Sequence, residues 1–129
     1  MLPTLDEEGA LEDIHSRIPI EELKQRGYTV RVVVVDGGSK DKTLEIAVEL
    51  GCEVIQQWGE GKGAGMRQGF KKFLESGDDA LVMLDCDGTY HPEEITRMVE
   101  SIPERGIAIG DRLHGDLKPD AMTSTNWIG

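Results

Sequence analysis

One stretch decides the fold: Thr29-Val30-Arg31-Val32-Val33-Val34-Val35, followed by Asp36-Gly37-Gly38-Ser39. Its β-branched residues are typical of a strand, and the unbroken apolar run predicts burial on both faces, as in a parallel sheet. Ser39 then suits the N-cap of a helix that runs to about residue 50. The stretch therefore predicts one strand–helix unit of an α/β fold.

The alternation of strand and helix continues on both sides of this unit. The other predicted strands are residues 1–4, 53–55, 80–85 and 106–109. The other predicted helices are residues 7–17, capped by Asp6, and residues 20–26, 66–74 and 92–102. This order predicts a single α/β domain with a mostly parallel sheet flanked by helices.

The composition limits the classes of function. The 129 residues suit one domain, and the formal net charge of −11 argues against a nucleic-acid partner. No apolar run approaches the roughly 20 residues that a membrane-spanning helix needs, and the first residues do not resemble a signal peptide. Cys52 and Cys86 are far apart, so we expect reduced thiols and a cytoplasmic protein.

A second stretch carries the strongest chemical signal. Residues 81–84 are apolar, and Asp85-Cys86-Asp87-Gly88-Thr89 follows them. A strand that ends in this way can place both carboxylates at the carboxyl edge of the sheet, where open α/β sheets bind ligands. Two hard oxygen ligands suit Mg²⁺ or Mn²⁺, and such an ion would hold phosphate oxygens. Asp85 and Asp87 are therefore the candidate metal ligands.

Other polar residues are expected at the same edge. Asp36 could accept a hydrogen bond from a base or ribose, and Lys62 lies in a glycine loop that could approach phosphate closely. Arg112 follows the last predicted strand and could bind an acceptor phosphate or close the site. Arg67 could assist Lys62, and a surface arginine is an equal alternative. For His91, helix capping or exposure to solvent is favoured over metal ligation. A flexible loop and a simple turn remain alternatives for the Lys62 and Asp36 segments.

Together these motifs resemble the family 2 glycosyltransferases of the GT-A fold, and most closely their dolichol-phosphate mannosyltransferase-like branch. The segments that carry the resemblance are residues 2–8, 33–43, 61–63, 84–92 and 109–112. The resemblance implies a Rossmann-like three-layer fold, a nucleotide-sugar donor (a GDP- or UDP-sugar), a divalent metal and inversion at the anomeric carbon. It also implies a polyprenyl or dolichyl phosphate acceptor, which is already ionised and needs little help from a general base.

The resemblance also implies roles for single residues. The catalytic set is Asp85, Asp87 and Arg112, with Asp87 on the metal and Asp85 matching the other half of the Asp-x-Asp motif. The residues expected to bind the nucleotide sugar are Pro3, Asp6, Glu7, Asp36, Gly38, Lys62 and Asp85. Of these, Lys62 matches a position near the phosphates, as Arg112 does.

The chain departs from the family pattern in several places. Asp6 stands where the family usually has Asn, Gly37 stands where it often has Asp, and the first strand is nearly absent. The family's domain also continues past residue 129 into a part that binds the acceptor. Residues 1–129 are therefore expected to form one donor-binding domain that is short at its C-terminus, with the acceptor part largely absent.

Three functions follow as hypotheses. The first is a metal-dependent inverting glycosyltransferase that acts on a nucleotide sugar. The second is a non-catalytic nucleotide-binding module, or a partial enzyme that needs a partner. The third is a phosphatase of the haloacid dehalogenase type, because Asp85-Cys86-Asp87-Gly88-Thr89 also fits that motif. The expected location is the cytoplasm or the cytoplasmic face of a membrane, and homo-oligomerisation stays open.

Overall fold

The computed structural model describes residues 1–104 and 106–110 of the chain. Its strands are β1 (Leu2–Thr4), β2 (Val33–Asp36) and β3 (Glu53–Gln56). Its helices are α1 (Leu11–Arg17), α2 (Ile20–Gln25), α3 (Thr43–Glu49), α4 (Lys62–Ser76) and α5 (Ile95–Ser101), with a short 3-10 turn, η1 (Pro92–Glu94), before α5. No helix in these ranges is long and apolar enough to cross a membrane.

The strands form a parallel sheet in the order β1-β2-β3. Thr4 is level with Asp36, and Asp36 is level with Gln56, so the three strands end together. Two more backbone bonds continue this pairing by one residue, from Gly37 N to Thr4 O and from Gln57 N to Asp36 O. The loops that follow the strands therefore leave from one edge of the sheet.

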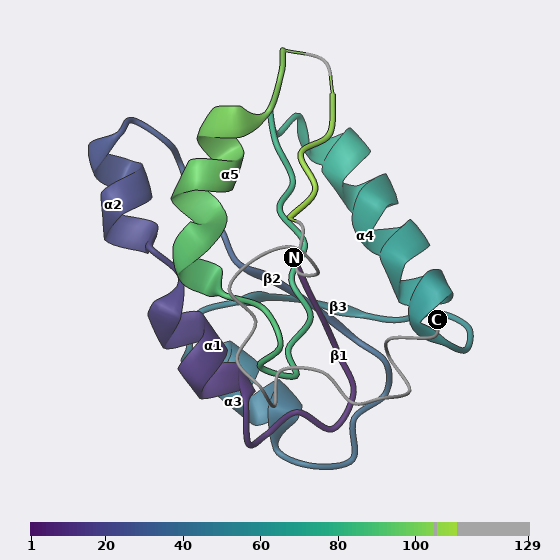
Figure 1. The fold of residues 1–129 in the computed structure, drawn as a ribbon. Coiled ribbons are helices and arrows are strands. Elements are labelled where there is room, and N and C mark those ends of the chain that lie inside the picture. Colours follow the sequence, from purple (N-terminus) through teal and green to yellow (C-terminus); the bar gives the residue numbers. More distant parts are fainter. Residues whose placement is uncertain (105, 111–129) are drawn as a thin grey trace, which may run out of the picture.

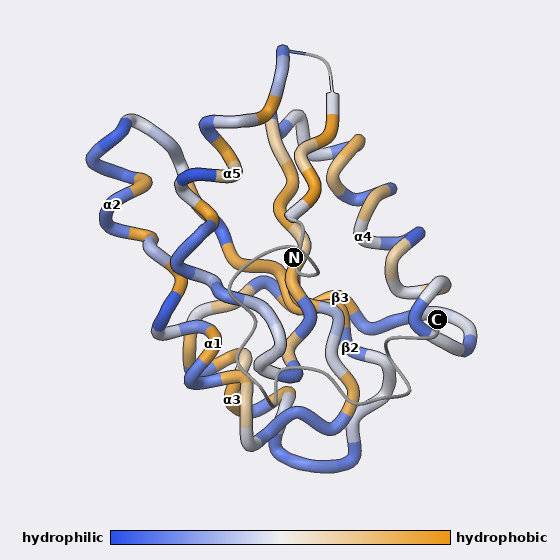
Figure 2. The backbone as a smooth tube through the Cα atoms, viewed as in Figure 1, coloured by the Kyte–Doolittle hydropathy of each residue, from blue (hydrophilic) through white to orange (hydrophobic). Residues whose placement is uncertain are grey.

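The central strand is buried on both faces, as its sequence predicts. Val34 is fully buried in a cluster that includes Leu11 and Ile14 of α1, while its neighbour Val35 faces α4. Successive side chains of a strand point to opposite faces, so both faces must be covered. Figure 1 shows α4 on one side of the sheet and α1 and α5 on the other, which confirms the three-layer arrangement. In Figure 2 the hydrophobic colour follows the strands at the centre.

Residues 80–85, which were predicted to form a strand, do not form one. The only described backbone bonds of this segment to the sheet are with the first residue: the Met1 amine donates to Val82 O at 2.7 Å, and Leu84 N donates to Met1 O at 3.2 Å. The segment thus lies beside β1, where the prediction needs it, but it is not a regular strand.

A cavity of about 450 Å³ lies where further pairing would be needed. Residues 29–33 and 77–82 line two of its sides, and α4 contributes Gly69 and Phe73. This also explains why the central strand begins at Val33 rather than at Thr29 as predicted. Residues 29–32 have the β-branched composition of a strand. In the described part of the chain, one backbone bond joins them to the sheet, from Glu53 N to Val32 O at 2.9 Å, and the residues before Val32 line the cavity.

The last predicted strand, residues 106–109, is not formed either. Ile107 and Ile109 are 84% and 86% exposed, so this segment does not bury the side chains that would make it part of the sheet. Its apolar composition alone was therefore a poor guide. Residues 111 and 112 lie outside the described residues, as does the rest of the chain beyond them.

Two loops at the carboxyl edge are joined by side-chain hydrogen bonds, which replace the predicted helix caps. Asp6 accepts from Lys40 N at 2.7 Å, and its own N–H donates to Ser39 Oγ. The Glu8 carboxylate accepts from Lys42 N at 2.9 Å, and Glu8 N donates to Asp41. Neither Asp6 nor Ser39 is an N-cap: α1 begins after Ala10 and α3 after Lys42, and neither has a side-chain cap. The predicted caps are wrong because these side chains bind the opposite loop.

Candidate functional site at the carboxyl edge of the sheet

A pocket of about 220 Å³ lies at the edge where the three strands end. It is lined by Pro3, Thr4, Leu5, Glu7, Val35, Gly37, Gln57, Gly61, Lys62, Asp85, Cys86 and Asp87. Five residues singled out from the sequence are therefore brought together: Pro3, Glu7, Lys62, Asp85 and Asp87. The register of the parallel strands is the cause, because it brings segments distant in sequence to one edge.

Lys62 and Asp85, which both line this pocket, form an ion pair. Lys62 Nζ lies 2.5 Å from Asp85 Oδ1, and the Asp85 side chain is 22% exposed. Lys62 is also the first residue of the 15-residue helix α4, whose N-terminus carries unpaired N–H groups and partial positive charge. The lysine and the helix end therefore give this side of the pocket the means to attract an anion.

Asp87 is held by a local turn. Its Oδ1 accepts hydrogen bonds from Thr89 N at 3.0 Å and from Thr89 Oγ1 at 2.6 Å. Burial opposes the charged form, but these bonds outweigh it, and the pKa of Asp87 lies below its ordinary value. In the described part of the chain, both bonds end on Oδ1. The turn thus keeps Asp87 ionised and fixes its direction while Oδ2 stays available for a ligand.

Glu7 completes an acidic group in the pocket. Its pKa lies above the ordinary value, first because burial removes water and then because the carboxylates of Asp87, Asp41 and Asp85 are near. Its backbone is fixed, since Glu7 N donates to Thr43 Oγ1 at 2.8 Å. Like charges gathered in this way disfavour one another unless a cation joins them.

Asp36 has a different place from the one expected. We predicted a carboxylate free to face a ligand, but Asp36 is 1% exposed and accepts bonds from Gly38 N, Ser39 N and the Ser39 hydroxyl. The expectation of a free carboxylate is wrong, because the turn after β2 folds back onto it. Asp36, Gly38 and Asp6 do not line the pocket. Their hydrogen bonds hold the loops that follow β1 and β2.

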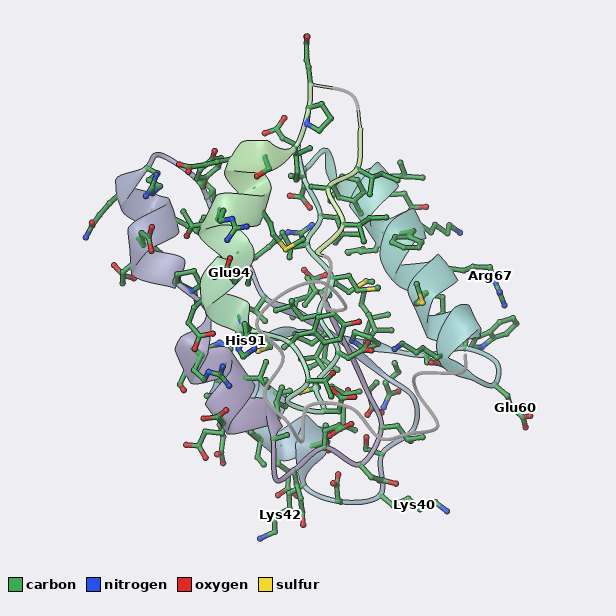
Figure 3. The ribbon with its side chains drawn as sticks, viewed as in Figure 1. Lys40, Lys42, Glu60, Arg67, His91 and Glu94 are labelled. Carbon is green, nitrogen blue, oxygen red and sulfur yellow. The ribbon has the colours of Figure 1, made fainter. Side chains whose placement is uncertain are left out.

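The remaining candidates lie away from the pocket or outside the described residues. Figure 3 shows Arg67 and Glu60 extending outward from α4 and its preceding loop, and Arg67 is exposed. His91 is exposed and begins η1 through its backbone carbonyl rather than its side chain. The surface alternative for Arg67 and His91 is therefore favoured. Arg112 lies outside the described residues, so its predicted role stays a prediction.

Sequence reasoning missed one residue of the pocket, Gln57. Its side chain lines the pocket and binds the glycine loop that leads to Lys62. Its position just after β3, level with the ends of the other strands, was the available signal. Cys86 was expected to be a buried packing residue, and at 1% exposed it is one.

The residues present suit a hard divalent cation that also binds phosphate. Within the described residues no group of three or more His, Cys, Asp or Glu side chains could enclose a metal by itself. Mg²⁺ and similar ions are usually held by one or two carboxylates, and phosphate and water supply the remaining oxygens. The fixed Asp87 and its neighbour Asp85 match that pattern, and the crowding of carboxylates around Glu7 supports a cation between them.

Comparison with known proteins agrees with this geometry. The family model described as glycosyl transferase family 2 matches residues 3–128. Glycosyltransferase AglJ of Haloferax volcanii is 35% identical over 130 residues, covering all of this chain and 40% of that protein. The dolichol-phosphate mannosyltransferase of Pyrococcus furiosus is 36% identical over 118 residues, covering 87% of this chain and 32% of that protein. The chain thus spans well under half the length of these two relatives.

A solved structure shows the same fold. Glucosyl-3-phosphoglycerate synthase from Mycobacterium tuberculosis, in complex with Mn²⁺, UDP and phosphoglyceric acid, superposes with a TM-score of 0.58 at 26% identity. The match covers 77% of this chain and 36% of that one. With the family model matching nearly the whole sequence, these findings show that the chain belongs to glycosyl transferase family 2.

Proposed function

We propose that this domain binds the diphosphate of a nucleotide sugar together with Mg²⁺ or Mn²⁺, and that it is the donor site of an inverting glycosyltransferase. The observation that carries the proposal is the convergence of Lys62, Asp85 and Asp87 in one pocket at the N-terminus of α4. A cation site and an anion site that adjoin in this way match the charge pattern of a metal diphosphate.

Asp87 and Asp85 would hold the metal, which when bound supplies positive charge to the leaving diphosphate. The protein's own contribution is electrostatic. Lys62 and the first N–H groups of α4 neutralise phosphate oxygens, and Thr89 holds Asp87 in its charged form. Pro3 and Glu7 line the side of the pocket next to β1, where the nucleoside would lie.

A polyprenyl phosphate is the proposed acceptor. Relatives of the chain include the dolichol-phosphate mannosyltransferase already described and an undecaprenyl-phosphate mannosyltransferase of Micrococcus luteus, which is 33% identical over 108 residues. A phosphate acceptor is ionised at neutral pH, so the pocket needs no general base beside it. Such an acceptor would place the working protein at the cytoplasmic face of a membrane.

A donor site that acts only with further protein is the second candidate function. The chain covers 40% of AglJ and 32% of the Pyrococcus enzyme, so the activity of those whole proteins is not assigned to it. Nucleotide binding without sugar hydrolysis or transfer would support this candidate over a complete enzyme. The family match favours both candidates over the phosphatase hypothesis.

The proposal is tested by replacing Asp87 with Asn, which keeps the size of the side chain but removes its charge. We expect binding of UDP or GDP in the presence of Mn²⁺ to weaken at least about tenfold, as for loss of one charged ligand. The matched control is Glu60→Gln, because Glu60 extends from the neighbouring loop into solvent (Figure 3). Isothermal titration calorimetry measures both. Equal affinity in the Asp87→Asn variant and the native chain would exclude the assignment.

A further inference from the structure

The part of the β3–α4 loop next to Lys62 is held by the side chain of Gln57. Its backbone is fixed first, because Gln57 N donates to Asp36 O at 2.7 Å and so continues the pairing of β2 with β3. Its side-chain amide then donates twice, to Gly59 O at 2.8 Å and to Gly61 O at 3.1 Å. One amide group therefore spans the whole glycine turn.

This turn needs such support. Gly59 and Gly61 both have positive φ angles, 87° and 78°, which glycine adopts freely. The same freedom lets glycine leave that conformation easily, so the turn is not fixed by its own backbone. The two bonds from Gln57 tie it to the end of β3, a part of the sheet that is already in place.

The point that Gln57 holds is also the start of α4. Gly61 is the N-cap residue of α4, and Gly61 O accepts the bond from Ala64 N at 2.9 Å. Lys62 follows directly, and its Nζ reaches Asp85. A shift of Gly61 would therefore move both the helix end and the lysine away from the aspartate.

A glycine inside α4 leaves room for the side-chain amide of Gln57. Gly65 is buried in α4, and a Cβ built there would collide with Gln57 Oε1 and lie 3.3 Å from Val35 Cγ1. Glycine inside a helix costs about 1 kcal/mol relative to alanine. Among the glycines of α4, Gly65 is the one at which an added methyl group would collide with the Gln57 amide.

We infer that Gln57 is a positioning residue for Lys62: by bonding Gly59 and Gly61 it holds the lysine and the N-terminus of α4 toward the diphosphate. The inference rests on the proposed function, since it assigns to Lys62 the phosphate contact proposed above. Gln57 itself does not need to touch the nucleotide.

The first test compares two glutamines that bind the same loop. Gln57→Ala removes the bonds to the glycines next to Lys62, whereas Gln68→Ala removes the 2.6 Å bond to Trp58 O, further from the lysine. In Mn²⁺, we expect affinity for UDP or GDP to fall about tenfold in Gln57→Ala and less than about twofold in Gln68→Ala. Gln57→Glu keeps the side-chain size but lacks the donors, so it should behave like Gln57→Ala.

The second test separates positioning from a general structural role. In a Lys62→Ala background, Gln57→Ala should cause a smaller loss of affinity than in the native chain, because the lysine contact is already gone and only the end of α4 remains to be displaced. Gly65→Ala should cause the same loss of affinity as Gln57→Ala although residue 57 is still glutamine, because the added methyl group displaces its side chain. The losses caused by Gly65→Ala and Gln57→Ala should not add in the double variant. Thermal unfolding of each variant confirms that it is folded.

The outcomes distinguish the two proposals. If the native chain binds neither UDP nor GDP in Mn²⁺, the proposed function fails and the role of Gln57 fails with it. If the native chain binds, but Gln57→Ala equals Gln68→Ala or adds fully to Lys62→Ala, the inference about Gln57 alone is wrong. Non-additive losses at Gln57, Lys62 and Gly65 establish it.

Discussion

The residues of the site differ in how well the sequence alone predicts their roles. Asp85, Asp87 and Lys62 could be predicted because a charged group after a strand or in a glycine loop has few structural uses. Gln57 could not, because its role depends on the path of the loop that it binds. Asp36 was correctly predicted at the end of a strand. Its burial could not be predicted, because it depends on the turn that folds back onto its carboxylate.

Cys86 provides a prediction at this scale. Burial, and then the nearby Glu7 and Asp87 carboxylates, raise the pKa of its thiol to about 12. In a Cys52→Ser variant, where Cys86 is the only thiol, we expect no reaction with Ellman's reagent at pH 8 in the native state and complete reaction in urea. A native thiol that reacts as fast as free cysteine would contradict the buried position between the two aspartates.

Thr43 and Thr96 provide a matched pair of buried hydroxyls. Thr43 Oγ1 accepts from Glu7 N and donates to Asp41, whereas Thr96 Oγ1 has no partner among the described residues. Thr43→Val leaves the Glu7 N–H unpaired and should lower the free energy of unfolding by about 1–3 kcal/mol. Thr96→Val removes an unpaired polar group and should leave stability unchanged or raise it. Urea unfolding measures the free energy of unfolding of both variants. Equal losses would contradict the role of Thr43 in joining the loop before α1 to the loop before α3.

At the scale of elements, the alternation of strands and helices could be predicted and the completeness of each strand could not. The segment of residues 80–85 has the composition of a buried strand, and it lies beside β1 as expected. A strand, however, is formed by its partner as well as by its own sequence. Within residues 1–104 and 106–110, the backbone bonds of this segment to the sheet are the two with Met1, and a cavity lies beside it.

The amine of Met1 makes this edge sensitive to pH. It is buried and donates to Val82 O, and burial lowers its pKa from 8.0 to about 6, with a smaller opposing effect of Cys52. Between pH 6 and pH 8 the unfolded chain therefore binds more protons than the folded one, so stability should rise with pH across this window. Two pH units correspond to roughly 3 kcal/mol as an upper value.

The measurement is urea unfolding at pH 6 and pH 8, with an Nα-acetylated chain as the control. Acetylation removes the titrating amine but keeps an N–H for Val82, so the rise in stability should shrink. All other ionisable groups are the same in both forms, so their contributions cancel in the comparison. An identical pH dependence in the two forms would show that the amine is not buried as described.

At the scale of the whole molecule, the parallel register accounts for the site. The strand ends at Thr4, Asp36 and Gln56 are level, and the segment ending at Asp85 lies next to them. This convergence follows from the α/β fold class, so the sequence could predict it without any contact being known. The hydrogen bonds that join the loops after β1 and β2 could not be predicted, because they form between side chains and backbone groups of distant segments.

The central claim is that this pocket binds a nucleoside diphosphate through a divalent cation. The most direct measurement is calorimetric titration of the native chain with UDP and with GDP, first in Mn²⁺ and then in excess EDTA. We predict that at least one nucleotide binds in Mn²⁺ and that the binding is lost in EDTA. Binding of equal strength in both solutions, or no binding of either nucleotide, would contradict the account.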